Sequence, residues 1–548
     1  MKKFIFLAVS AAIMFTGCTN WEKIREEVAE KNKKAFEEVF HNQIDPEQDW
    51  NVVENSYVNV SVGQPSDIRI YAFDGKRNTM VANYKGVSGS QKLTFDNLKG
   101  IKQVYVANMT QRKAIIADLN GSADFAGSKN AVRYEDDEIS IEPILDWTPS
   151  TLRITLEDLQ NNPVCEKDYM NIAYYAFQDF KLTPMFWDQL FGEVKIGVFY
   201  YDADGNRKEH IVYNRLQNAS EPGGFYKYLA WGAFQELYDA NYPNWLRDED
   251  RLADDNIKSR TIHVTMAEPG QQFGFFIQTE HISGRPMKIF SDHAENEIEL
   301  QKVLNGEGIY AGADVYFKDR AKDFLAGSCC VLTKVGDRHY LRFECYNQDS
   351  RNYDSMVFAI DDTRIVPVWD VPSSWTLAIE DMGTINDYDF NDVVLSVAHA
   401  AGETTATVKF LAIGCTIENW IYYNDQKLGE AHEIFGEKDM KKVINTRTKT
   451  AQPVVMTINV PADFSLSVDG STEGIGGFRI TNQFNSGTRL QEIGSIPYMI
   501  CVPGDWRWPL ENVNINRGYN GFNDWVGDHS KAGEWFKTIS DPEAVIEE

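Results

Sequence analysis

Histidine, cysteine and positive charge are scarce in this sequence of 548 residues. It has 9 His and 7 Cys, and 54 Lys+Arg stand against 81 Asp+Glu, a formal net charge of −27. Clustered Lys and Arg drive binding to phosphate backbones and to anionic lipid headgroups. The charge balance therefore argues against nucleic acid and anionic membrane surfaces as partners. The 43% of hydrophobic residues nevertheless suffices for several globular cores.

The short motifs of common catalytic sites are absent as well. There is no G-x-S-x-G, no H-E-x-x-H and no P-loop, and the glycines between Gly306 and Gly312 miss the dinucleotide spacing. Carboxylate pairs suited to glycoside hydrolysis arise by chance among 81 acidic residues, so none identifies a site. We therefore expect a protein that is not an enzyme.

The cysteines form no C-x-x-C pair and no Cys/His zinc spacing. We expect the six that follow Cys18 to be mostly buried apolar thiols. Cys329 and Cys330 are too close in sequence to bridge easily. The six are Cys165, Cys329, Cys330, Cys345, Cys415 and Cys501.

The N-terminal segment has the pattern of a bacterial lipoprotein signal. Lys2 and Lys3 precede an apolar stretch, residues 4–15, that suits a signal peptide and is short for a membrane span. Gly17-Cys18 then resembles the lipobox, although Phe15 stands where Leu is usual. We expect cleavage before Cys18 and acylation of that residue, which anchors the chain in a lipid bilayer. An ordinary secretory signal with a coincidental Cys is the alternative.

The expected location is the cell outer membrane. By resemblance to lipoprotein sorting, Thr19 in place of Asp after Cys18 suits that membrane, and the face stays open. Removal of residues 1–17 takes away two lysines and no acids, so the mature charge is −27 − 2 = −29. No second apolar segment of membrane-spanning length follows.

The remaining chain reads as one helix followed by strands. Residues 21–40 place apolar side chains near one helical face and predict a stalk helix, which Asp45-Pro46 terminates. After Trp50 the pattern alternates with period two, separated by Gly, Asn and Ser turns. The strands predicted most clearly are 57–62, 67–71, 103–106, 194–200, 261–265, 273–277 and 405–411, and short helices are expected at 520–526 and 531–536.

We therefore expect a mostly β fold of tandem β-sandwich domains, immunoglobulin-like or jelly-roll-like, behind the stalk helix. The predicted divisions are a signal peptide (1–17), the lipidated Cys with the stalk (18–50), an immunoglobulin-like sandwich (51–145), a β-rich middle domain (146–365), and a β-rich C-terminal domain with a Trp-rich tail (366–548).

The strongest local signal is an acidic loop at residues 380–392. Asp387, Asp389 and Asn391 have the D-x-D-x-N spacing that turns alternate oxygens inward, and a hard cation such as Ca²⁺ takes six to eight oxygens. The remaining ligands would come from Glu380, Asp381 or Asp392. A regular EF-hand is excluded, because Asp392 replaces its Gly and Ala398 its final Glu. The alternative is a solvated acidic hairpin with Asx turns.

Two weaker signals accompany this loop. The segment from Glu344 to Ser355 repeats its pattern with fewer oxygens, Cys345 standing for Asp381, Asn352 for Asp389 and Ser355 for Asp392. We expect it to bind metal weakly or not at all. Residues 202–206 also resemble a calcium loop, but Asp-Gly between two strands favours a hairpin turn.

The acidic loop and several other stretches resemble the LruC-domain family of Bacteroides-type cell-envelope lipoproteins, with its associated C-terminal domain of unknown function. The other similar stretches are residues 44–50, 200–206, 401–408 and 499–509. The resemblance implies a β-sandwich envelope lipoprotein whose acidic loop is a calcium site. It implies no enzymatic activity.

The first functional hypothesis is an outer-membrane-anchored binding or adhesion protein with structural calcium, whose ligand is a glycan or an envelope or host protein. The alternatives are an envelope structural or fimbria-associated component and, third, a glycan-processing enzyme. The 13 Trp and 25 Tyr offer sugar-stacking surfaces, although core packing explains aromatic residues in β-sandwiches equally simply.

Overall fold

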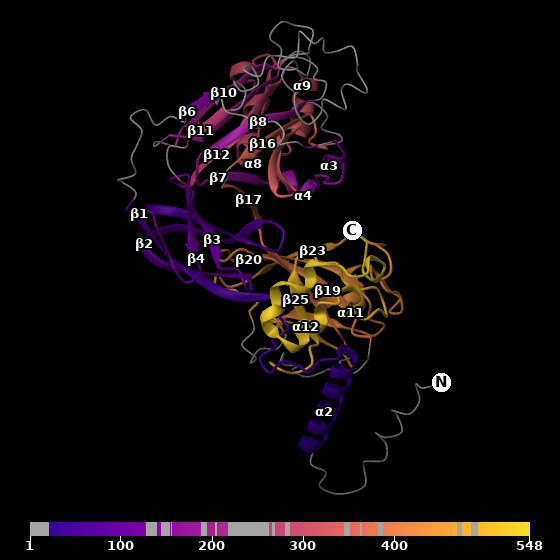
Figure 1. Ribbon diagram of the computed structural model, residues 1–548. Coiled ribbons are helices and arrows are strands. Elements are labelled where there is room, and N and C mark those ends of the chain that lie inside the picture. Colours follow the sequence, from indigo (N-terminus) through magenta and orange to yellow (C-terminus); the bar gives the residue numbers. More distant parts are fainter. Residues whose placement is uncertain are drawn as a thin grey trace.

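The structure is a computed structural model that describes most of the chain after residue 20. It is mostly β, with four sheets among the described residues (Figure 1). No helix of this part is long and apolar enough to cross a membrane. The described residues are 21–127, 140–143, 154, 156–187, 194–202, 205–216, 262–265, 269–279, 285–344, 351–361, 364–381, 387–467, 474–483 and 492–547. Cys18 and the predicted signal peptide lie outside them.

The largest sheet has 11 strands and begins with a long hairpin, β1 (Val53–Phe73) and β2 (Asn78–Leu98). Buried and exposed residues alternate along β1, and the strands predicted at 57–62 and 67–71 are both parts of it. One hydrogen-bonded sheet thus continues across the predicted boundary at residue 145. Its other strands are β3 (Gln103–Asn108), β4 (Lys113–Asp118), β5 (Ser122–Asp124), β7 (Ile172–Ala176), β9 (Val194–Tyr201), β10 (Arg207–Leu216), β12 (Gln271–Thr279), β13 (Met287–Phe290) and β17 (Ile365–Pro372).

A second sheet of six strands packs with this one around an apolar core that includes Phe273, Phe275 and Phe358. Two helices, α8 (His293–Asn305) and α9 (Val315–Phe324), contribute Val303 and Phe317 to the same core. The six strands are β6 (Ser140–Pro143), β8 (Phe180–Trp187), β11 (Ile262–Thr265), β14 (Cys330–Val335), β15 (Arg338–Phe343) and β16 (Met356–Asp361). Two short helices, α3 (Leu156–Gln160) and α4 (Glu166–Tyr169), precede β7.

The third sheet holds the acidic loop. Its order is β23-β20-β19-β18-β25, so β18 (Ser374–Ile379) and β19 (Val393–Ala398) are interior strands. The other strands are β20 (Thr405–Ile413), β23 (Val454–Asn459) and β25 (Met499–Pro503). A three-stranded sheet of β21 (Trp420–Tyr423), β22 (Gln426–Glu430) and β24 (Phe478–Thr481) lies beside it in the same core.

The two ends of the described chain share one core. Helix α2 (Trp21–Phe40) projects from the body in Figure 1, and its last turns contact the rest. Phe36, Phe40 and Trp50 are fully buried, and Trp50 packs against Phe522 and Trp525. The last two belong to α12 (Phe522–Gly527), which follows α11 (Ile515–Gly518) and precedes the 3₁₀ turns η5 (His529–Gly533) and η6 (Trp535–Lys537).

Two smaller predictions are confirmed. Cys329, Cys330, Cys415 and Cys501 are buried free thiols, whereas Cys165 is exposed. The strands β9 and β10 on either side of residues 202–206 pair antiparallel, as in a hairpin, and Asn206 N–H donates to Asp202 Oδ1 at 2.8 Å. The aromatic stretch from Gly224 to Leu246 lies outside the described residues.

Candidate metal centre

The acidic loop closes a hairpin between two interior strands. Ile379, the last residue of β18, pairs with Val393, the first of β19, and both are fully buried. The loop ends are therefore fixed by a packed sheet, and the acidic side chains begin one residue beyond it. Residues 382–386 lie outside the described part of the chain.

Three carboxylates converge in this loop. Oxygens of Glu380, Asp387 and Asp389 all lie within 4.8 Å of one another, and we call these three residues the acid cluster. Glu380 is 5% exposed and Asp389 3%, while Asp387 is half-buried. In the described part of the chain no Lys, Arg or His forms an ion pair with any of the three. Such a group can hold a cation by its donor chemistry.

The electrostatics of the acid cluster favour a bound cation. Burial, followed by the charges of Asp392 and Asp389, raises the pKa of Glu380 well above its usual range. Burial and Asp387 raise the pKa of Asp389 to about 8. Like charges at this separation, removed from water, disfavour one another's ionisation. A divalent cation would reverse that penalty.

Backbone hydrogen bonds orient the cluster. Phe390 N–H donates to Glu380 Oε1 at 2.6 Å, and Asn512 N–H donates to Asp389 Oδ2 at 2.7 Å. Tyr388 and Phe390 have φ of +46° and +48°, a left-handed conformation that bulky residues rarely adopt. Both rings are buried in the core, so packing stabilises the unusual backbone.

Asn391 presents an oxygen that lacks a partner. The side chain is 1% exposed, its Nδ2 donates to Pro509 O at 3.0 Å, and its Oδ1 is buried without a hydrogen bond. An unsatisfied buried acceptor costs about 1–3 kcal/mol. A cation beside Asn391 Oδ1 would remove that cost, which fits the predicted role of Asn391 as a ligand.

Glu511 joins the site from a distant part of the sequence. A Cβ atom added at Gly414 would overlap Asn391 Oδ1 and lie 2.9 Å from Glu511 Oε2, so the two oxygens face the same space. Burial raises the pKa of Glu511, the hydrogen bond from Thr446 and the charge of Arg447 act against this, and the charge of Asp387 raises the pKa further. Sequence reasoning missed Glu511, because Leu510-Glu511-Asn512 belongs to no motif.

Asp381 and Asp392 form a second group beside the acid cluster. Asp392 Oδ2 accepts from Asp381 N–H at 2.7 Å, and Asp381 Oδ2 accepts from Asn419 Nδ2 at 3.0 Å. Asn482 Nδ2 donates to the Asp381 carbonyl at 3.0 Å. These bonds join the loop to the ends of β21 and β24. Of the six predicted ligands, the structure places oxygens of Glu380, Asp387 and Asp389 within 4.8 Å of one another, while Asp381 and Asp392 contact each other. Glu380 and Asp389, like Asp381 and Asp392, also accept hydrogen bonds from the protein.

The earlier loop between β15 and β16 has the same backbone features with different chemistry. Arg351 and Tyr353 have positive φ, at the positions that align with Tyr388 and Phe390. The buried guanidinium of Arg342 donates to the carbonyl oxygens of Asn352 at 2.8 Å and Tyr353 at 3.0 Å. Ser355 Oγ donates to Glu344 Oε1 at 3.0 Å. Cys345 lies outside the described residues.

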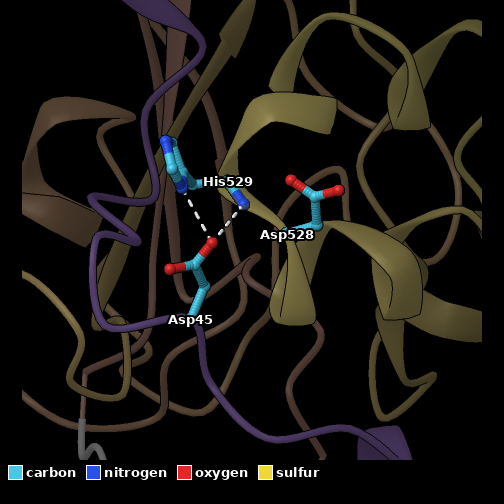
Figure 2. A group of neighbouring side chains, drawn as sticks. All are labelled: Asp45, Asp528 and His529. Carbon is cyan, nitrogen blue, oxygen red and sulfur yellow. Dashed lines mark hydrogen bonds and ion pairs between the residues drawn. The ribbon is translucent and has the colours of Figure 1, made fainter.

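Asp45, Asp528 and His529 also offer ligand atoms within 4.8 Å of one another (Figure 2). His529 Nδ1 lies 2.7 Å from Asp45 Oδ2, which also accepts the His529 backbone N–H at 2.9 Å. This oxygen therefore already has two partners in the protein. The group connects the segment after α2 to the C-terminal helices.

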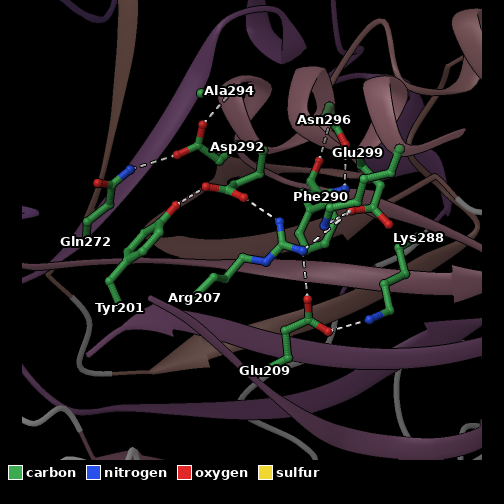
Figure 3. Close-up of polar contacts among 12 residues, drawn as sticks. Tyr201, Arg207, Glu209, Gln272, Lys288, Phe290, Asp292, Ala294, Asn296 and Glu299 are labelled. Atoms are coloured by element: carbon green, nitrogen blue, oxygen red, sulfur yellow. Dashed lines mark hydrogen bonds and ion pairs between the residues drawn. The ribbon is translucent and has the colours of Figure 1, made fainter. Parts of the chain in front are cut away.

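A further set of carboxylates, of which Glu295 and Glu299 are buried and Glu209 is partly exposed, has its own cation (Figure 3). Arg207 pairs with Glu295, and its Nη2 lies 3.0 Å from Glu209 Oε1 and 3.5 Å from Glu299 Oε2. Lys288 Nζ also contacts Glu209 Oε2 at 2.5 Å. Side chains of the protein thus neutralise these carboxylates, in contrast to the acid cluster.

Comparison with known proteins finds one similarity. Residues 480–536 match the family model described as a domain of unknown function, DUF4842. No curated protein and no solved structure matches the chain. The matched segment includes Glu511, Asn512 and α12. The part of the chain similar to this domain thus contacts the candidate metal centre, through Asn512 at Asp389 and through Glu511 near Asn391.

Proposed function

We propose that the protein is a non-enzymatic binding or adhesion protein of the cell envelope, anchored at the outer membrane by lipid on Cys18 and stabilised by calcium in the 380–392 loop. The observation that carries the calcium proposal is the acid cluster, whose oxygens converge without an ion pair to a cation of the described chain. Asn391, two residues after Asp389, adds a buried Oδ1 that has no hydrogen-bond partner. All available donors are oxygens, as a hard cation prefers.

The ligands would be Glu380, Asp387, Asp389, Asn391 Oδ1 and Glu511. Asp381 and Asp392 would orient the loop without binding the ion. Asp381 N–H donates to Asp392, and Asn419 and Asn482 donate to Asp381. The ion would be structural, because a cation that binds only the folded loop stabilises the fold by mass action. It would hold together segments that lie more than a hundred residues apart.

The wider role rests on the architecture. Several β-sheets with a projecting N-terminal helix support a mostly β body on a membrane stalk, with a glycan or an envelope or host protein as the ligand. The resemblance to LruC-domain lipoproteins supports the same role. Glycan-array binding that is lost on addition of EDTA would support it. Release of sugars from host or plant polysaccharide would contradict the non-enzymatic assignment.

The calcium proposal is tested by thermal unfolding. We expect millimolar Ca²⁺ to raise the Tm of the wild type and to leave Asp389→Ala unchanged, with a reduced shift in Glu511→Gln. Asp425→Ala is the control, since Asp425 is exposed in the turn between β21 and β22. Equal shifts in wild type and Asp389→Ala would contradict the assignment.

Lipidation is tested separately by incorporation of radiolabelled palmitate in the native host. We expect labelling of the wild type and none of Cys18→Ala. Labelling of both variants would exclude Cys18 as the acylated residue.

A further inference from the structure

Tyr388 connects the acid cluster to the helix that precedes the body of the protein. It stands between Asp387 and Asp389. Its ring packs edge-on against Phe36 at 5.1 Å between centroids and in a tilted arrangement against Phe40 at 5.5 Å. Its carbonyl accepts from Ile515 N–H at 3.0 Å. One residue between two candidate ligands therefore contacts both α2 and the C-terminal segment.

Helix α2 is attached to the body through its C-terminal half. Residues 27–31 are exposed, and the helix extends away from the sheets in Figure 1. Lys33 Nζ donates to Gly494 O at 2.9 Å, and Phe36 and Phe40 enter the aromatic core. Phe36 also packs edge-on against Trp50 at 5.6 Å, and Phe40 contacts Phe522 at 5.2 Å. Tyr388 is thus one of three aromatic residues that hold the last turns of α2.

We propose that metal occupancy of the acid cluster controls the docking of α2, with Tyr388 as the coupling residue. With an ion bound, Asp387 and Asp389 are drawn to one point and the backbone of Tyr388 between them is fixed, which presses its ring against Phe36 and Phe40. Without the ion, the two carboxylates repel each other. The contacts of Tyr388 with Phe36 and Phe40, which hold the last turns of α2, then weaken. The inference rests on the proposed calcium site and adds its regulation.

The consequence concerns geometry at the membrane. A lipid on Cys18 would leave α2 as the only described element between the anchor and the sheets. An ion that strengthens the packing of Phe36 and Phe40 against the aromatic core would fix the orientation of the β-sheets relative to the bilayer. Calcium would then act as a control of stalk orientation as well as a stabiliser.

The test is hydrogen exchange, followed by mass spectrometry, on the full-length protein in detergent. We expect amides of residues 27–40 to exchange about tenfold more slowly in 1 mM Ca²⁺ than in EDTA, since exchange reports local opening. Tyr388→Ala should lose the calcium effect on these amides even at calcium concentrations that saturate the variant by calorimetry, because removal of the coupling also changes its calcium affinity. Tyr316→Ala, an exposed aromatic on α9, should behave as the wild type.

Other outcomes separate the two proposals. Calcium binding by the wild type without a change in residues 27–40 would overturn the coupling and leave the calcium site intact. Absence of binding would overturn both. If Tyr388→Ala does not fold, Phe36→Leu serves instead. It lies outside the loop and should keep calcium binding while reducing the protection of α2; unaltered protection there would also overturn the coupling.

Discussion

In the loop that follows β15, the guanidinium of Arg342 donates to the carbonyl oxygens of Asn352 and Tyr353, whereas the loop that follows β18 gathers three carboxylates with no such cation in the described chain. Both loops join neighbouring antiparallel strands and both contain two bulky residues with positive φ. The two loops thus share a pair of residues with positive φ but differ in charge. A guanidinium contacts the first loop, and three carboxylates converge in the second.

The first loop has a cationic side chain of the protein in contact with it, and the acid cluster forms no ion pair with one in the described chain. Arg342 supplies N–H donors in a fixed geometry, and they satisfy the carbonyl oxygens of Asn352, Tyr353 and Asn162. The carboxylates around Arg207 and Lys288 are neutralised in a similar way by side chains. The 380–392 loop keeps its acids buried and leaves the Asn391 oxygen without a partner. A loop of this kind depends on its surroundings for positive charge.

Of the variants that test the difference between the two loops, removal of the Arg342 guanidinium should change the unfolding free energy most. Arg342→Met should destabilise the protein by about 3 kcal/mol, because buried carbonyl acceptors lose their charged donor. Arg342 also donates to Asn162 O at 2.6 Å, which adds to the loss. Urea unfolding measures the change. Calcium should raise the stability of this variant only as much as it raises that of the wild type. Full rescue by calcium would mean that the first loop accepts an ion after all.

The next effect concerns the space shared by Asn391 and Glu511. Gly414→Ala should cost about 2 kcal/mol, because its Cβ overlaps Asn391 Oδ1 and crowds Glu511 Oε2. Its cost should be larger in calcium than in EDTA, since the displaced oxygens are proposed ligands. Urea unfolding in both buffers gives the two values.

A matched control is Gly63→Ala, where the added Cβ meets only Ala126 Cα at 3.7 Å. This variant should change stability equally in calcium and in EDTA. If Gly414→Ala lowered the unfolding free energy equally in the two buffers, the space beside Gly414 would not be part of the metal site.

Local patterns predicted much of this structure. The apolar runs at 194–200 and 273–277 lie in β9 and β12, which are buried along almost their whole length, and such runs can be recognised from a few neighbouring residues. The acidic loop was identifiable from the density of carboxylates within one short segment. Its repeat at residues 344–355 was also visible, although the role of Arg342 was not.

Contacts between distant segments were beyond such reasoning. Glu511 approaches Asn391 only because the C-terminal segment folds over β19 and β20, and no residue near Glu511 signals a ligand. The contact of Tyr388 with Phe36 likewise joins residues that are far apart in the chain. Pairing across residue 145 in the largest sheet depends on partners that periodicity does not identify.

The smallest effect is expected from making the first loop resemble the second. Asn352→Asp restores the acid that aligns with Asp389, yet Asn352 is exposed and its amide donates to Asp354 Oδ2 at 2.7 Å. Water screens the new charge, and the lost hydrogen bond is a surface one, so we expect a change in unfolding free energy below about 0.5 kcal/mol. We also expect no added calcium response, because Asn352 is exposed and its carbonyl already accepts from the guanidinium of Arg342. Calcium titration by calorimetry checks this, with Ser355→Ala as a second variant that removes the bond to Glu344 without adding charge. A second binding event in Asn352→Asp would show that acid count alone, and not the internal arginine, separates the two loops.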